Sequence, residues 1–193
     1  MKSKYFLLIV VLFSVSSFAQ LKEADLVFKD GDTVPGYARL IKNNKIEFKL
    51  SLEEEADFYD GILTNEVIFY GDEGIEVFEF VKTGLKRKHV LMKLLVFGKA
   101  NLYESKEDYT EYLVQEDNIS SNKRNRYQDE VTRGLFLKRK KEPVGFKIGK
   151  SFKQTAEHYF RDCKAIKDLF QSRNYLKLTK EEIVKEYNFI CSD

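Results

Sequence analysis

Apolar and polar side chains alternate along most of residues 24–149, and a period of two predicts short β-strands. The alternation is clearest over residues 45–50, where every second side chain is apolar. Turn residues at 30–32 and 43–44 separate the first three strands, which predicts an antiparallel meander. In chain order, the predicted strands cover residues 26–28, 34–41, 45–50, 67–70, 75–81, 89–97, 102–103, 111–114, 134–138 and 144–148.

Two of these strands carry further information. Pro35 has no N–H to donate to a ladder, so the second strand is predicted to begin at an edge or a bulge. Residues 89–97 are the most apolar run after residue 19, which predicts a central strand covered on both faces. Residues 51–60, which are acidic, and residues 118–130, which lack periodicity, are predicted to be excursions outside the sheet.

From residue 151 the hydrophobic period changes to 3.6, which predicts helices. Phe152, Ala156 and Tyr159 mark the first helix. Asp162 is the predicted cap of a second helix over residues 163–172, and a capping box at residues 179–182 begins a third. The predicted fold class is therefore α+β. A mainly antiparallel sheet over residues 20–150, rolled, barrel-like or a sandwich, carries a C-terminal helical cap over residues 151–193 in a single domain.

Residues 1–19 have the features of a cleaved signal peptide. Lys2 and Lys4 precede an apolar run over residues 5–13, and small residues follow at the positions that a signal peptidase reads. The run is about half the length of roughly 20 residues that a membrane-spanning helix needs. We therefore expect cleavage near Ala19 and an extracytoplasmic protein, periplasmic or secreted, with no transmembrane helix in the mature chain.

The composition agrees with an exported globular protein. The 193 residues are 43% hydrophobic and 33% charged, which is enough for a self-sufficient core. The chain has 33 Lys and Arg against 31 Asp and Glu, and without the two leader lysines the charges balance. A neutral surface offers no general attraction for nucleic acid, so none is expected as a partner. Basic runs such as residues 138–141 are expected to be solvated.

Cys163 and Cys191 are the only cysteines, and in an exported protein such a pair predicts a disulfide. A bridge from the start of one predicted helix to the end of the next suits two antiparallel neighbours. The alternative is a reactive thiol assisted by His158. That histidine precedes Cys163 by five residues, a spacing that turns the two side chains apart on a helix.

The chain contains no HExxH or Cys/His zinc pattern, no GxSxG elbow and no glycine-rich nucleotide loop. The sequence therefore predicts no metal, no cofactor and no recognised catalytic residue. Its two histidines, His89 and His158, are interpreted as structural.

Two groups of side chains remain as candidates for a site. The first is acidic and could hold a hard cation or supply carboxylates to a hydrolase, although a solvated loop is the favoured interpretation. It comprises Glu53, Glu54, Glu55, Asp57 and Asp60. The second group could line a ligand face with flat rings and polar tips, although tyrosine is also common in strands. It comprises Tyr37, Tyr70, Tyr103, Tyr109 and Tyr112.

Four segments together carry a resemblance. They are DGDTVPGY at residues 30–37, IEVFEFV at 75–81, SFKQTAEHYFRDC at 151–163 and IVKEYNFIC at 183–191. With the short leader, this layout resembles small exported proteins of Bacteroidota that have no established activity. The resemblance implies a location and an architecture, and it transfers no site residues.

Three functions follow as hypotheses. The favoured one is an exported, non-catalytic module that binds a partner protein, a surface polymer or a small ligand in the cell envelope. The second is an exported hydrolase that uses carboxylates. The third is a structural component of envelope assembly.

Overall fold

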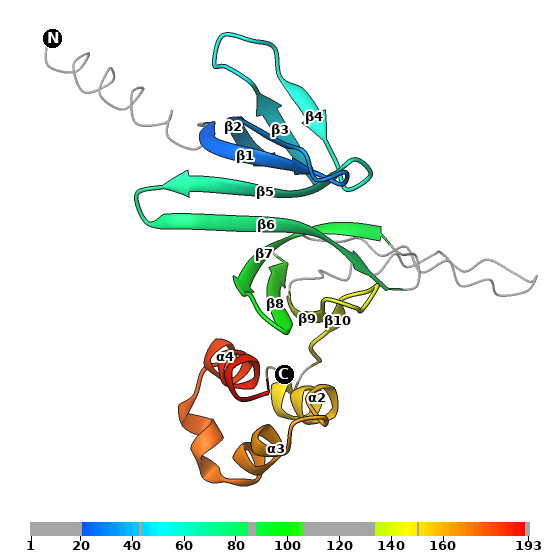
Figure 1. Cartoon of the computed structure of the whole chain (residues 1–193), viewed down its shortest axis with the longest axis vertical. Helices are drawn as coiled ribbons and strands as arrows, with labels where there is room; N and C mark the ends of the chain where they lie inside the picture. The colour runs from blue at the N-terminus through cyan, green and yellow to red at the C-terminus, as the bar shows by residue number, and fades with distance from the viewer. Residues whose placement is uncertain (1–20, 43, 85–87, 106–133, 150, 192–193) are drawn as a thin grey trace, which may run out of the picture. The chain divides into compact units, whose positions relative to one another are not determined.

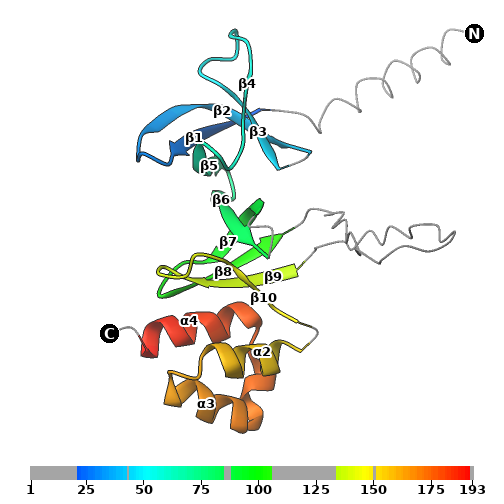
Figure 2. The ribbon, with the colours of Figure 1, turned by 90° about the vertical axis from the view of Figure 1, so that its right-hand side faces the viewer.

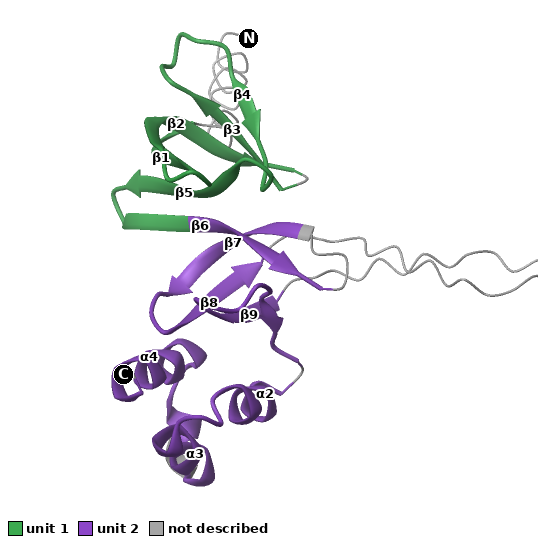
Figure 3. Ribbon diagram, turned by 45° about the vertical axis from the view of Figure 1, so that its right-hand side comes forward, with its two compact units in different colours: residues 1–77 green, residues 78–193 purple. Residues whose placement is uncertain are grey.

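The computed structural model describes residues 21–42, 44–84, 88–105, 134–149 and 151–191. These residues form two compact units, residues 1–77 and 78–193, with the boundary inside a strand (Figure 3). The sequence had predicted a single domain, with its regions divided at residue 150. Several predictions concern residues outside the described ranges. They are the signal peptide, the strand at 111–114, which includes Tyr112, the candidate Tyr109, and the excursion at 118–130.

The predicted fold class is confirmed: the described part of the chain is mostly antiparallel sheet, followed by helices (Figure 1). The strands are β1 (Lys22–Phe28), β2 (Thr33–Ile41), β3 (Lys45–Lys49), β4 (Asp57–Tyr59), β5 (Thr64–Gly71), β6 (Gly74–Thr83), β7 (Lys88–Val96), β8 (Ala100–Ser105), β9 (Gly134–Arg139) and β10 (Phe146–Lys147). The helices are α2 (Phe152–Tyr159), α3 (Lys164–Gln171), the 3-10 helix η2 (Arg173–Lys177) and α4 (Lys180–Ile190).

In unit 1 the strands pair in the order β5-β1-β2-β3-β4, so the predicted meander of β1, β2 and β3 is confirmed. Pro35 pairs with Asp25 of β1, whereas the register between β2 and β3 begins only at Tyr37. The proline thus occupies a section of β2 with a partner on one side, as its missing N–H requires. Strand β4 was not predicted, because it lies inside the acidic segment at 51–60.

The core of unit 1 gathers on one face of this sheet. Leu26, Ile46 and Val67 are completely buried there, and the ring of Tyr59 packs edge-on against Phe48 at 6.1 Å between centroids. Gly36 lies on the same face beneath the Phe48 ring. A Cβ at Gly36 would lie 2.6 Å from that ring and would collide with the Lys49 carbonyl oxygen, so only glycine fits without a shift.

In unit 2 the strands pair in the order β6-β7-β8-β9-β10. An isolated parallel bridge joins Thr83 to Gly145, so the chain between β9 and β10 returns to β6 and the sheet is rolled. One hydrophobic cluster is formed by Val81, Val90, Met92, Tyr103 and Phe136. Strand β7 lies between β6 and β8 and buries successive residues at 90, 91 and 92, which confirms that it is central and covered on both faces.

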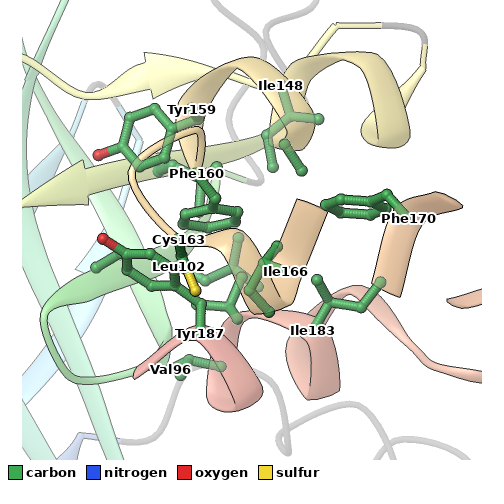
Figure 4. Close-up of a cluster of buried hydrophobic side chains, with 14 residues drawn as sticks. Val96, Leu102, Ile148, Tyr159, Phe160, Cys163, Ile166, Phe170, Ile183 and Tyr187 are labelled. Carbon is green, nitrogen blue, oxygen red and sulfur yellow. The ribbon is translucent and has the colours of Figure 1, made fainter. Parts of the chain in front are cut away.

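The helices of unit 2 pack beside β8 and β9 (Figure 2) and share a second, larger hydrophobic core with them. Figure 4 shows its labelled members, with the Phe160 ring between Tyr159 and Tyr187. Phe160 stacks on Tyr187 at 4.2 Å and meets Tyr159 edge-on at 5.2 Å. This core places the last turn of α2 directly against the sheet.

The predicted disulfide joins the start of α3 to the end of α4. Cys163 is the N-cap of α3 and Cys191 the C-cap of α4, and their Cα atoms lie 6.0 Å apart. The predicted capping box is confirmed, since Thr179 and Glu182 exchange both hydrogen bonds. The predicted cap of α3 was wrong: the cap residue is Cys163, and Asp162 binds other partners, described below.

Candidate functional site

A pocket of about 290 Å³ opens in unit 2 between the turn after β9 and the end of α2. Two walls form it. The sheet wall comes from the β9–β10 connection, and the helix wall from the last turn of α2 and the residues after it. The lining residues are Arg139, Glu142, Val144, Gly145, Phe146, His158, Tyr159 and Arg161.

Gly145 allows the sheet wall to approach β6. Its N–H donates to the Lys82 carbonyl oxygen at 2.8 Å, and a Cβ at this position would lie 2.8 Å from the Val81 side chain. The absence of a side chain at Gly145 therefore permits the close approach that this hydrogen bond holds. Phe146 follows Gly145 and is 45% exposed, and its ring is tilted against that of Tyr159, 5.8 Å between centroids.

Arg139 joins the two walls. Its Nη2 donates to the Tyr159 carbonyl oxygen at 2.8 Å and to Asp162 Oδ1 at 2.7 Å. The guanidinium carbon also lies 4.7 Å from the ring centroid of Tyr159 and 5.6 Å from that of Tyr187, distances at which cation–π attraction operates. One cation at the end of β9 therefore fixes the end of α2 and faces a ring of α4.

The two tyrosine hydroxyls complete this network from the helix side, and Figure 4 shows both pointing to the same side of the cluster. Tyr159 donates to Glu142 Oε2, which also accepts from the backbone N–H of Arg139 at 2.9 Å. Tyr187 donates to Asp162 Oδ2 at 2.9 Å. Each carboxylate thus bridges Arg139 to one tyrosine.

The network shifts the acidity of its members. Burial first, and then the hydrogen bond to Glu142, raises the pKa of Tyr159 well above its usual range. Burial, followed by the hydrogen bond to Asp162, also raises the pKa of Tyr187. For Arg139, burial acts to lower the pKa, while the contacts with Tyr187 and Asp162 outweigh it and raise the pKa. Both tyrosines therefore stay neutral and the arginine stays charged at ordinary pH.

These features make the inner part of the pocket a rigid scaffold whose polar groups are largely paired with one another. The outer part differs. His158 and Arg161 are exposed, and neither side chain makes a hydrogen bond or ion pair within the described part of the chain. The pocket thus combines an apolar ring, an interior held by hydrogen bonds and exposed polar side chains at its mouth.

The described tyrosine candidates are divided between the two units, and none of them lines the pocket. Tyr37 and Tyr70 belong to unit 1, where Tyr37 pairs with Glu23 and the Tyr70 hydroxyl donates to Asp25 at 2.6 Å. That hydrogen bond, with a smaller effect of burial, raises the pKa of Tyr70. Tyr103 is completely buried in unit 2, so its ring is a core side chain and cannot contact a surface ligand.

The acidic candidates belong to unit 1 and are not among the residues that line this pocket. Glu53, Glu54, Glu55 and Asp57 are exposed, and Asp60 accepts a hydrogen bond from the backbone N–H of Ile62 in a turn. Within the residues that the structure describes, no three His, Cys, Asp or Glu side chains gather closely enough to hold a metal ion.

The sequence did not single out the residues that build the pocket. Arg139 belongs to the basic run at 138–141, which was expected to be solvated, and its side chain is instead only 28% exposed. One local signal was present: Arg139 and Glu142 are three residues apart at a turn, and their ion pair spans 3.9 Å. His158, which the sequence analysis interprets as structural, is exposed and lines the pocket.

Comparisons with protein-family models, with curated proteins and with solved structures find no match to this chain. None of the described helices is long and apolar enough to cross a membrane.

Proposed function

We propose that this chain is an extracytoplasmic, non-catalytic binding module, whose ligand in the cell envelope enters the pocket of unit 2. The ligand is a small molecule, or a group carried by a surface polymer or a partner protein. The signal-peptide features of residues 1–19 and the disulfide support a periplasmic or secreted location.

The observation that carries the proposal is the construction of the pocket. Its interior is held by the Arg139 network, and the Phe146 ring and the Arg161 side chain remain available at its mouth. Such a preformed cavity with a few convergent polar groups is typical of ligand sites, because little order has to be gained on binding.

The geometry favours binding over the carboxylate hydrolase. The acids proposed for that reaction belong to unit 1, most of them are exposed, and none of them lines the pocket of unit 2. In the pocket of unit 2, Glu142 accepts hydrogen bonds from Tyr159 and from the Arg139 N–H. A carboxylate engaged in this way is a poor general base, because proton uptake would disrupt both bonds.

The test uses a pocket-filling variant. His158→Trp places a large ring at the mouth, and Gln154→Trp places the same ring at an exposed position of α2 outside the lining. A panel of envelope glycans, peptidoglycan fragments and small metabolites is screened by thermal shift and by amide chemical-shift changes. A ligand that stabilises the wild type and Gln154→Trp, and not His158→Trp, supports the proposal. Equal binding to all three proteins, or no ligand in the panel, contradicts it.

A further inference from the structure

The charges around the pocket do not cancel. On residues 139–142 and 158–162, four Lys or Arg side chains face two carboxylates. Arg139 is paired with Asp162 and lies near Glu142, so both carboxylates are already engaged. The remaining cations are Arg161 in the lining, and Lys140 and Lys141, which are exposed in the turn that precedes Glu142. Within these two segments the cations outnumber the carboxylates, so an anion entering the pocket meets a net positive charge from them.

The donors at the mouth can hold such an anion. A guanidinium binds carboxylate and phosphate oxygens in a two-pronged arrangement, and Arg161 has no other partner among the described residues. His158, which precedes it by three residues and shares the lining, adds a second nitrogen donor. By contrast, the Nη2 of Arg139 is already occupied by Tyr159 and Asp162.

The apolar part of the pocket indicates which kind of group is attached to the anion. Phe146 is 45% exposed, and its ring is supported by the Tyr159 ring, 5.8 Å away between centroids at an interplanar angle of 37°. A supported aromatic ring offers a flat surface to another ring. The volume of about 290 Å³ is at the small end for ligand sites and fits one ring with one charged group.

We propose that this pocket binds an anionic group, a carboxylate or a phosphate, attached to a flat apolar ring. Arg161 and His158 hold the anion, and Phe146 holds the ring. The inference rests on the proposed function, because it names the ligand chemistry of the same site.

The test uses five defined probes with the full mature chain. Benzoate and phenyl phosphate carry both features, acetate and inorganic phosphate carry the anion alone, and benzyl alcohol carries the ring alone. Binding is measured by calorimetry and by chemical-shift changes of amides in α2 and β10. We expect benzoate or phenyl phosphate to bind at least about tenfold more tightly than benzyl alcohol, equivalent to about 1.4 kcal/mol. The stronger of the two identifies the anion.

Matched variants separate the two contacts. Arg161→Gln should weaken the binding of both ring-bearing anions about tenfold or more. Lys167→Gln changes an exposed position of α3 outside the lining and should leave their affinities unchanged. Phe146→Leu should weaken benzoate and phenyl phosphate more than acetate and phosphate. Each variant is accepted only with a melting temperature close to that of the wild type.

Three results overturn the inference. They are equal binding of benzyl alcohol and benzoate, no effect of Arg161→Gln, and no probe that shifts the amides of the pocket at millimolar concentration. In each case the proposed function is judged separately by the His158→Trp screen, because an uncharged ligand excluded by that variant would preserve the binding module and reject the anion.

Discussion

Replacing Arg139 with methionine tests whether this one side chain holds the sheet and the helices of unit 2 together. Methionine keeps an unbranched apolar stem, so the packing of the aliphatic part of Arg139 is largely retained. What disappears is the guanidinium, with its two hydrogen bonds to Tyr159 and Asp162 and its contacts with two rings. The variant therefore reports on the polar network rather than on a cavity.

The expected cost can be worked out from the contacts. A hydrogen bond to a charged group contributes about 1.5–3 kcal/mol, and each cation–π contact about 0.5–1 kcal/mol. The ion pair with Asp162 is discounted, since that carboxylate is 43% exposed and water replaces its partner. Because contacts in one network are not additive, we expect a loss of about 2–4 kcal/mol. Arg139→Lys should lie between methionine and the wild type, since an ammonium cannot reproduce the fork.

The assay is urea unfolding followed by circular dichroism, together with hydrogen exchange of amides in β9 and α2. Arg161→Met is the matched control, because that arginine makes no ion pair or hydrogen bond in the described part of the chain and should cost less than about 0.5 kcal/mol. A double-mutant cycle with Asp162→Asn should give a coupling of at least about 0.5 kcal/mol. The reasoning is refuted if Arg139→Met is as stable as its control and exchange in α2 does not change.

Three further results are expected. Gly36→Ala should destabilise unit 1 by about 1–3 kcal/mol in urea unfolding, because the new Cβ meets a carbonyl oxygen and a ring. The control Gly71→Ala should be close to neutral, because the nearest atom to its Cβ would be 3.8 Å away. Equal losses of stability in the two variants would contradict the packing argument. Replacing Cys163 and Cys191 together by alanine should cost about 3–4 kcal/mol for a bridge that spans 28 residues, and free-thiol titration of the unfolded wild type should find none without reductant. Because folding raises the pKa of Tyr159, the stability that its hydroxyl contributes is complete below about pH 10 and declines as the pH rises toward the raised pKa. Tyr159→Phe should reduce that decline by up to about 1.4 kcal/mol per pH unit. If the free energy of unfolding falls with pH equally in both proteins between about pH 9 and 11.5, folding does not raise the pKa of this hydroxyl.

The candidate site shows where sequence reasoning stops. Residues 138–141 have the same composition as an ordinary solvated run, and nothing in their spacing distinguishes Arg139 from its neighbours. Its partners Tyr159 and Asp162 are 20 and 23 residues further along the chain. Asp162 illustrates the same limit from the other side. Local spacing predicted Asp162 as the cap of a helix, whereas in the structure its carboxylate forms an ion pair with Arg139, which is distant in sequence.

The sequence by itself determined the elements that depend on near neighbours. The period of two in β1–β3 and the capping box of α4 are set within a few residues, since alternation and capping involve side chains close along the chain. Only the tertiary structure decided that the sheet of unit 2 rolls at Gly145, that Tyr103 is buried, and that Arg139 meets α2. Those outcomes depend on which surfaces pack together. The free energy gained by burying apolar surface comes from contacts between residues that are distant in the sequence, so no local pattern reveals it.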